Sequence, residues 1–318
     1  MEGVINILKP PGMTSHDVVA LLRRLLGEKR IGHCGTLDPE AAGVLPVCVG
    51  QATRLADYLS GGDKSYYCEM ALGYETDTQD IWGATIWVCP VDTPDPLGEP
   101  EKLAEAARSL EGKVMQEAPA YSSVKREGKS LHQYAREGKP ITGVMRQVDI
   151  RSIRLLDAWP ASPASPAPWR DRPVRFIVDC GSGTYVRMIC RDMGRKLGCG
   201  AAMSSLLRLR VGPFHLDQSV SLDEIKRMKE DGEGFEAVLH PKELALTRMT
   251  ELHVEDEEAL RLRHGQGVWL PGGEAVKPEE GRAWASEAGG RLVALGAYTP
   301  GSGDRAGWVF FKPDKTFL

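Results

Sequence analysis

The sequence lacks the features that mark membrane-spanning and secreted proteins. Its 318 residues contain no run of eighteen apolar residues, and the N-terminus has no charged-then-apolar leader pattern. Seven cysteines are present, but none stands in a CxxC pair, which argues against a disulfide framework and against a zinc site. We therefore expect a cytoplasmic protein whose cysteines are mostly small buried apolar side chains.

Motifs for common cofactors are also missing. Gly181-Ser182-Gly183 begins like a dinucleotide-binding loop, but Val186 stands where the third glycine of G-x-G-x-x-G is required. The segment from Thr76 to Asp80 lacks the ligand spacing of an EF-hand, which argues against calcium. The sequence predicts neither a nucleotide cofactor nor a metal.

The charges are unevenly distributed, although the net charge of −4 gives no indication of a nucleic-acid partner. Residues 121–175 hold eleven Lys and Arg against five Asp and Glu, and residues 181–212 hold six basic residues against Asp192 alone. A local basic face can bind phosphates on an acidic protein, because charge interactions are screened over roughly 10 Å. Ordinary solvated faces would show the same pattern, so charge alone leaves both interpretations open.

Apolar periodicity predicts an α+β protein. Helical spacing begins after Ser15, a candidate N-cap, and stops at Gly27. Three further segments are expected to be helical: residues 51–59, 101–111 and 184–197. Four segments have the pattern of buried or half-buried strands: residues 44–49, 64–73, 147–156 and 174–180.

The pattern changes near residues 240–248, and we expect a second, mostly β domain of about seventy residues beyond it. This part has a short helical segment at 255–264 and strand patterns at 291–297 and 307–312. The Pro-, Ala- and Ser-rich stretch from Trp159 to Pro173 is typical of an insertion between two strands rather than of a domain linker.

A Gly-rich segment at residues 32–43 is the first candidate for chemistry. His33 and Asp38 lie in it, and its glycines let the backbone turn sharply and approach a ligand closely. A loop between a helix and a buried strand is a common place for a catalytic carboxylate. From the residues alone, Asp38 before Pro39 could equally be a turn or cap residue.

This segment resembles the signature of TruB-type pseudouridine synthases. The pattern Gly-His-x-Gly-x-Leu-Asp-Pro-x-Ala-x-Gly-x-Leu-Pro stands intact from Gly32 to Pro46. Further segments agree with the family in order and spacing: Lys9–Ser15, Lys64–Gly73, Pro119–Leu131, Gly183–Arg187 and Leu206–Arg208. The resemblance covers roughly residues 4–213. The chain departs from the family in a longer insertion at 159–172 and in Pro119-Ala120, where a double proline is more usual.

The resemblance implies the pseudouridine synthase fold, a mixed, mainly antiparallel sheet flanked by helices. Residues 1–245 would form the catalytic domain, with an RNA-clasping insertion at about 119–146. Residues 249–318 resemble a small β-rich PUA domain that binds RNA. The implied activity is isomerisation of uridine 55 in the T-loop of tRNA to pseudouridine, a reaction that needs no cofactor and no metal.

The family also implies roles for three catalytic residues. Asp38 would be the essential carboxylate, acting at C6 or C1′ or assisting a glycal route. Arg187 would keep that carboxylate ionised, because a nearby guanidinium opposes the effect of desolvation. Tyr66 would stack on the uracil and is a candidate for removing the C5 proton.

Other residues would bind the RNA. His33 resembles the residue that fills the space left by the extruded base, Leu206 would line the uracil pocket, and Asp80 lies at a family position near the RNA. Five basic residues are expected to contact phosphates: Lys64, Lys125, Arg126, Lys129 and Arg136.

Two other classes of function use the same residues. One is a tRNA-folding chaperone that binds without chemistry, and the other is a metal-dependent hydrolase built on His33 and Asp38, which lacks a further ligand cluster. The long basic clasp at 119–140 favours direct recognition of tRNA over dependence on a guide RNA. We expect a monomer with no membrane association.

Overall fold

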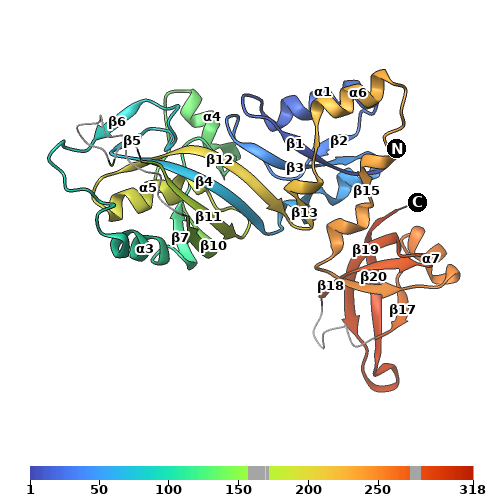
Figure 1. The fold of residues 1–318 in the computed structure, drawn as a ribbon. Helices are drawn as coiled ribbons and strands as arrows, with labels where there is room; N and C mark the ends of the chain where they lie inside the picture. The colour runs from blue at the N-terminus through green and yellow to red at the C-terminus, as the bar shows by residue number, and fades with distance from the viewer. Residues whose placement is uncertain (157–168, 170–171, 273–280, 318) are drawn as a thin grey trace.

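Two units make up the chain in the computed structural model, which describes residues 1–156, 169, 172–272 and 281–317. Figure 1 shows an elongated unit built on a long sheet, with a smaller unit, coloured orange to red, below one end of it. Of the expected insertion at 159–172, only Trp169 and Arg172 are described, and the rest lies outside the described residues. No helix of the described chain is long and apolar enough to cross a membrane.

The large sheet has eleven strands, eight of which follow one another along a single path. Their order is β14 (Val220–Ser221), β1 (Gly3–Lys9), β3 (Ala42–Val49), β12 (Ala201–Val211), β4 (Lys64–Leu72), β11 (Val174–Cys180), β10 (Met145–Leu155) and β7 (Gly112–Glu117). The other three pair at its side: β2 (Ile31–His33), β13 (Phe214–His215) and β15 (Leu239–His240). Only β1–β14 and β3–β12 pair in parallel, which confirms the expected mixed, mainly antiparallel sheet.

Alternating burial explains the central strands. Tyr66, Cys68, Met70 and Leu72 of β4 are all buried, which confirms that they share one face. β11 shows the same alternation and pairs with β4 in antiparallel register. The buried face of these strands packs against α5 (Val186–Lys196), so the helix that carries Arg187 lies against the strand that carries Tyr66.

The helices of this unit cover the sheet: α1 (Ser15–Leu26), α2 (Ala56–Ser60), α3 (Pro100–Arg108), α4 (Leu131–Arg136), α5 and α6 (Leu222–Glu230). α1 ends at Gly27, which adopts the left-handed conformation expected of a helix C-cap. Its N-cap is Thr14 rather than Ser15, because Thr14 and Asp17 form a reciprocal capping box. Ser15 is fully buried and makes a different contact, described below.

The helix expected at 51–59 is divided in two. Residues Gly50–Leu55 form a 3₁₀ helix, η1, and α2 follows directly. The Thr53 hydroxyl donates to the Gly50 carbonyl at 2.8 Å, a local bond that satisfies an acceptor at the start of the tighter turn. Three more 3₁₀ turns follow later in this unit: η2 (Leu216–Gln218), η3 (Glu236–Val238) and η4 (Lys242–Leu246).

Two short hairpins project from the large sheet. One joins β5 (Tyr74–Thr76) to β6 (Thr85–Val88), and the other joins β8 (Lys125–Arg126) to β9 (Lys129–Ser130). The second hairpin leads into α4, and together they occupy the expected clasp region.

The smaller unit is a five-stranded sheet with one helix. The strand order is β16 (Thr250–His253), β18 (Gly281–Glu287), β19 (Arg291–Pro300), β20 (Trp308–Thr316) and β17 (Val268–Pro271). α7 (Asp256–Arg263) packs on it, and η5 (Gly303–Arg305) lies between β19 and β20. The unit therefore has a core of its own, as expected for a β-rich C-terminal domain.

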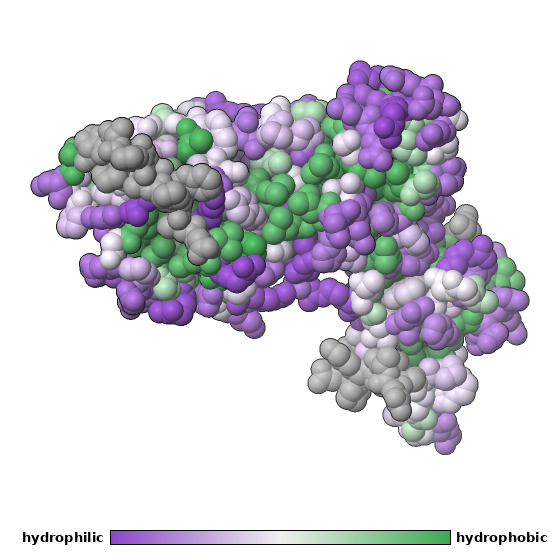
Figure 2. All heavy atoms as spheres, viewed as in Figure 1, coloured by the Kyte–Doolittle hydropathy of each residue, from purple (hydrophilic) through white to green (hydrophobic). Residues whose placement is uncertain are grey.

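A hydrophobic cluster joins the two units. Its buried members come from η1, η4 and the smaller unit: Leu55, Leu246, Trp284, Leu292, Leu295 and Phe317. Figure 2 shows mainly hydrophilic residues at the outer ends of the molecule and a band of hydrophobic residues across the middle of the larger unit.

Candidate functional site

The Asp38 loop connects β2 to β3 and is tied to the chain that follows β1. The Gly12 N–H donates to the Pro39 carbonyl at 3.0 Å, and the Lys9 ammonium donates to the same oxygen at 2.9 Å. Lys9 is fully buried, and desolvation lowers its pKa to about 8. Hydrogen bonds therefore join the segment Lys9–Ser15 to the Asp38 loop, the two N-terminal segments that resemble family motifs.

Ser15 fixes the residue before Asp38. Its hydroxyl accepts from the Leu37 N–H at 3.0 Å and donates to the Leu37 carbonyl at 3.3 Å. Because Ser15 begins α1, the Asp38 loop is attached to the first turn of a helix.

A buried arginine holds the other side of the loop. Arg208 of β12 is fully buried, and its guanidinium donates to the carbonyls of Gly35 (3.1 Å), Thr36 (3.3 Å) and Val44 (2.7 Å). Gly43 has a positive φ of 111°, and a Cβ there would lie 2.3 Å from the Arg208 carbonyl oxygen. Only glycine permits this close approach of the two strands.

Asp38 and Arg187 form a two-contact ion pair. Arg187 Nε lies 2.9 Å from Asp38 Oδ2, and Nη2 donates to Oδ1 at 3.2 Å. The side chain of Arg187 is only 5% exposed, whereas that of Asp38 is 37% exposed. A carboxylate that is paired on one side and open on the other can meet a substrate while the guanidinium holds its orientation.

Arg187 also contacts two other parts of the chain, near Thr78 and at Tyr121. Its Nη1 donates to the Thr78 carbonyl at 2.9 Å and lies 3.8 Å from Asp80 Oδ2, and its Nη2 donates to the Tyr121 carbonyl at 3.1 Å. Burial raises the pKa of Asp80 despite the nearby guanidinium. Asp80 is therefore part of the Arg187 environment, beside the site.

Tyr66 lies on β4 directly opposite Arg208 in the sheet register. Its side chain is buried, and desolvation raises its pKa to about 12, although Arg208 acts in the opposite direction. Tyr66 belongs to the same hydrophobic cluster as Leu206 and Leu37. Tyr66 and Leu206, the two residues expected at the uracil, therefore lie in one core region. Leu206 is 7% exposed.

His33 lies at the end of β2, on the chain that enters the Asp38 loop. Desolvation lowers its pKa to about 4, with smaller contributions from His16 and Arg208. The rings of His16 and His33 meet edge to face, with centroids 5.1 Å apart. Buried Nδ1 of His33 has no hydrogen-bond partner among the described residues, so the neutral ring retains an unused polar atom.

Lys64 is not a surface contact as expected. It is buried, and its ammonium donates to the carbonyls of Ser60 (2.8 Å) and Gly62 (2.9 Å). Burial lowers its pKa to about 8. The ammonium closes the turn before β4 through these two carbonyls, and its contact with a phosphate stays a prediction.

The four other basic residues expected at phosphates lie on the clasp. Lys125, Arg126 and Arg136 are exposed. Lys129 is half-buried, forms an ion pair with Glu137 and lies 5.0 Å from the Tyr134 ring centre. Three of the four cations are therefore open to a ligand, and the fourth is already engaged within the clasp.

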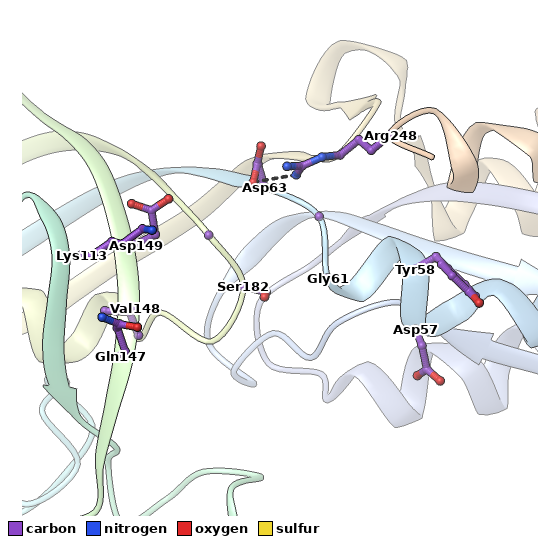
Figure 3. Close-up of a pocket in the computed structure, with 12 residues that line it drawn as sticks. Asp57, Tyr58, Gly61, Asp63, Lys113, Gln147, Val148, Asp149, Ser182 and Arg248 are labelled. Atoms are coloured by element: carbon purple, nitrogen blue, oxygen red, sulfur yellow. Dashed lines mark ion pairs between the residues drawn. The ribbon is translucent and has the colours of Figure 1, made fainter. Parts of the chain in front are cut away.

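A separate groove lies away from Asp38. Its volume is about 530 Å³, and it is bounded by α2, the ends of β10 and β11, and Arg248. Figure 3 shows Asp63 and Arg248 facing each other, with Lys113 and Asp149 to one side and Tyr58 to the other. This mixed-charge groove contains none of the residues expected at the site.

Three residues at the site could not be assigned from the sequence. Lys9 and Arg208 lie within the matching motifs, but an isolated basic residue gives no indication that it will be buried against carbonyls. Tyr121 contributes its backbone, which no side-chain pattern reveals. Within the described chain, no group of three His, Cys, Asp or Glu side chains is arranged to hold a metal ion.

Comparison with known proteins shows the family of the chain. Residues 23–186 match the model "TruB family pseudouridylate synthase (N terminal domain)", and residues 187–247 match "tRNA pseudouridylate synthase B C-terminal domain". The tRNA pseudouridine synthase B of Moorella thermoacetica is 41% identical over 98% of both chains. That of Symbiobacterium thermophilum is 45% identical over 83% of this chain and 82% of its own.

Solved structures give the same result. The crystal structure of a Cbf5–Nop10–Gar1 complex contains a chain that superposes with a TM-score of 0.73, at 28% identity, over 99% of this chain and 85% of that one. A structure of an H/ACA RNP bound to a substrate RNA containing 2′-deoxyuridine gives a TM-score of 0.71 at 26% identity, over 99% of this chain and 85% of that one. The chain belongs to the TruB family of pseudouridylate synthases.

Proposed function

We propose that this chain converts uridine 55 in the T-loop of tRNA to pseudouridine, with Asp38 as the essential carboxylate. The observation that carries the proposal is the two-contact pair between a buried Arg187 and a part-exposed Asp38. Relatives that match 98% and 85% of the chain are named tRNA pseudouridine synthase B.

The reaction breaks the N1–C1′ bond, turns the uracil and joins C5 to C1′. C5 then loses its proton and N1 gains one, so the product is an isomer of the substrate. Neither an electron nor an external group is exchanged. Attack of Asp38 at C6 or C1′, and assistance of C2′ proton loss, all require an ionised carboxylate. The Arg187 guanidinium pairs with this carboxylate and complements its negative charge.

Tyr66 has the position and chemistry of a stacking residue. A pKa of about 12 keeps its phenol neutral at physiological pH, so its ring can lie against the uracil without a competing charge. The neighbouring Arg208 acts against this shift, but burial has the larger effect and disfavours the phenolate, so the pKa supports stacking rather than removal of the C5 proton. Leu206 shares its hydrophobic cluster and would line the same pocket.

The target base must leave the loop of the RNA before it can reach Asp38. We propose that His33, neutral and with a free ring nitrogen, occupies the vacated space. Asp80 would lie beside the RNA, and Lys125, Arg126, Lys129 and Arg136 on the clasp would bind its phosphates. In this proposal residues 1–245 form the catalytic domain, residues 249–318 form an RNA-binding domain, and tRNA binds directly without a guide RNA.

A T-stem-loop RNA tests the assignment. We expect the purified protein to form one pseudouridine, at position 55, when the product is mapped at nucleotide resolution. A matched RNA with cytidine at position 55 should yield none. Pseudouridine at another uridine would contradict the proposed position, and bound but unchanged RNA would favour a chaperone.

A further inference from the structure

The outer face of β17 and β20 carries aromatic side chains. Side chains that point inward from these paired strands are at most 2% exposed: Val268, Leu270, Val309 and Phe311. Because side chains alternate along a strand, the residues between them point outward. Those residues include Trp269 on β17, and Trp308 and Phe310 on β20.

The outward rings form one surface together with a cation. Trp269 lies opposite Phe310, with ring centroids 5.3 Å apart at an angle of 51°. The guanidinium carbon of Arg305, in η5, lies 5.0 Å from the Trp269 ring centre. Trp308 continues the surface and is 41% exposed. We call Trp269, Trp308, Phe310 and Arg305 the aromatic face.

Glycines allow the aromatic face to be built close to the backbone. A Cβ at Gly267 would lie 2.5 Å from the Phe310 ring, and one at Gly301 would lie 2.3 Å from the Arg305 carbonyl. The Phe310 ring therefore packs directly on the backbone of Gly267, and the η5 turn packs on that of Gly301. The surface is already formed in the free chain.

The charges on this face suit an anionic partner. Within the described chain, Arg305 has no carboxylate within ion-pair distance, and Lys312, two residues after Phe310, is exposed on the same side of β20. Asp314, farther along the strand, is neutralised by Arg282 at 2.6 Å. Asp304 is the acidic neighbour of Arg305 in η5.

We propose that the aromatic face binds unpaired nucleotides of RNA by stacking. Bases stack on aromatic rings and on guanidinium planes, and nearby cations attract the phosphates. Exposed Arg305 and Lys312 lie beside the rings, and these cations favour a partner that carries phosphates. This inference rests on the proposed function, because it assumes an RNA substrate.

The aromatic face and the Asp38 site lie on different sheets. Binding at the aromatic face therefore contributes to affinity and leaves the chemical step unchanged. Loss of the face should raise KM for an RNA with an unpaired segment, and kcat should remain the same.

The test measures binding of a labelled single-stranded oligoadenylate of eight nucleotides by fluorescence anisotropy. The full chain is compared with the double variant Trp269→Ala/Trp308→Ala and with Trp87→Ala. Trp87 is a matched control, since it is also 41% exposed but lies on β6. We expect the double variant to bind about five- to tenfold more weakly, and Trp87→Ala to bind like the parent.

Pseudouridine formation in a blunt T-stem-loop hairpin serves as the second readout. It should be equal in the parent and the double variant, which also shows that the variant is folded. Oligoadenylate binding that is absent from the parent, or unchanged in the double variant, would overturn the inference even if the hairpin is modified. Failure to modify the hairpin would instead count against the proposed function.

Discussion

Arg187 illustrates how one buried residue can connect distant segments and orient a carboxylate. Its guanidinium is almost fully buried, and it contacts Asp38, the carbonyls of Thr78 and Tyr121, and more distantly Asp80. A lysine could not reproduce these contacts, because an ammonium is a point charge without a planar fork. The same contacts that stabilise the buried cation therefore orient the carboxylate.

His33 makes stability depend on pH. Its pKa is about 4 in the folded chain against an ordinary value of 6.5, so the unfolded chain binds the proton more readily between these values. The contribution of His33 to the free energy of unfolding is therefore fully present above pH 6.5 and is lost as the pH falls towards 4. The contribution is about 1 to 3 kcal/mol for a partly exposed histidine.

Chemical denaturation at pH 7.5 and pH 5 measures this effect. We expect the loss of unfolding free energy between the two values to be smaller in His33→Gln than in the parent. His264→Gln, at an exposed position on the end of α7, is the control and should behave like the parent. If His33→Gln and the parent lose the same unfolding free energy between the two pH values, burial of His33 is not the cause of the pH dependence.

At the scale of elements, the first turn of α1 performs two separate tasks. Thr14 caps the helix, whereas Ser15 holds Leu37, the residue before Asp38. We expect Thr14→Ala to lower the free energy of unfolding by about 1 kcal/mol and to leave activity nearly unchanged. Ser15→Ala should lower kcat, because the Asp38 loop loses an anchor.

Thermal unfolding and single-turnover kinetics on the same two variants separate these tasks. The adjacent positions are matched in location, and both changes remove a hydroxyl. A Ser15→Ala variant with the kcat of the parent would show that the loop does not depend on Ser15. An equal fall in kcat in both variants would contradict the separation of the two tasks.

The sequence predicted the elements in which burial has a simple period. β11 was predicted at 174–180, as observed, and α5 differed from the expected 184–197 by two residues at one end and one at the other. β1, β12 and α6 were not assigned. β12 has two register shifts against β4, and these interrupt the alternation that identifies a strand.

Family motifs predicted the site residues, but not how they meet. Asp38 and Arg187 are 149 residues apart, and their contact requires the whole large sheet. Lys64 shows the limit of charge as a predictor, because a lysine at a strand end can satisfy nearby carbonyls instead of an external phosphate. The buried role of Arg208 depends equally on contacts from distant strands.

At the scale of the whole molecule, the smaller unit is held to the larger one by a compact apolar junction. Phe317 is 1% exposed in this junction, and the Arg54 guanidinium lies 4.8 Å from its ring centre. We expect Phe317→Ala to lower stability by about 3 to 5 kcal/mol. Calorimetry should then show the smaller unit unfolding at a lower temperature than the large sheet.

Leu260→Ala is the control for this experiment. Leu260 is 56% exposed on α7, outside the junction, and its removal should leave the unfolding profile unchanged. A Phe317→Ala variant with the parent's profile would mean that the junction contributes little to stability.

The most direct measurement of the central claim is single-turnover pseudouridine formation by Asp38→Asn. The substitution keeps the size of the side chain and removes its negative charge. Glu40→Gln, two residues farther along the same loop, makes the same change outside the Arg187 pair. We predict that Asp38→Asn binds the T-stem-loop but forms no pseudouridine, while Glu40→Gln remains active. Measurable pseudouridine from Asp38→Asn would contradict the assignment of Asp38 as the essential carboxylate.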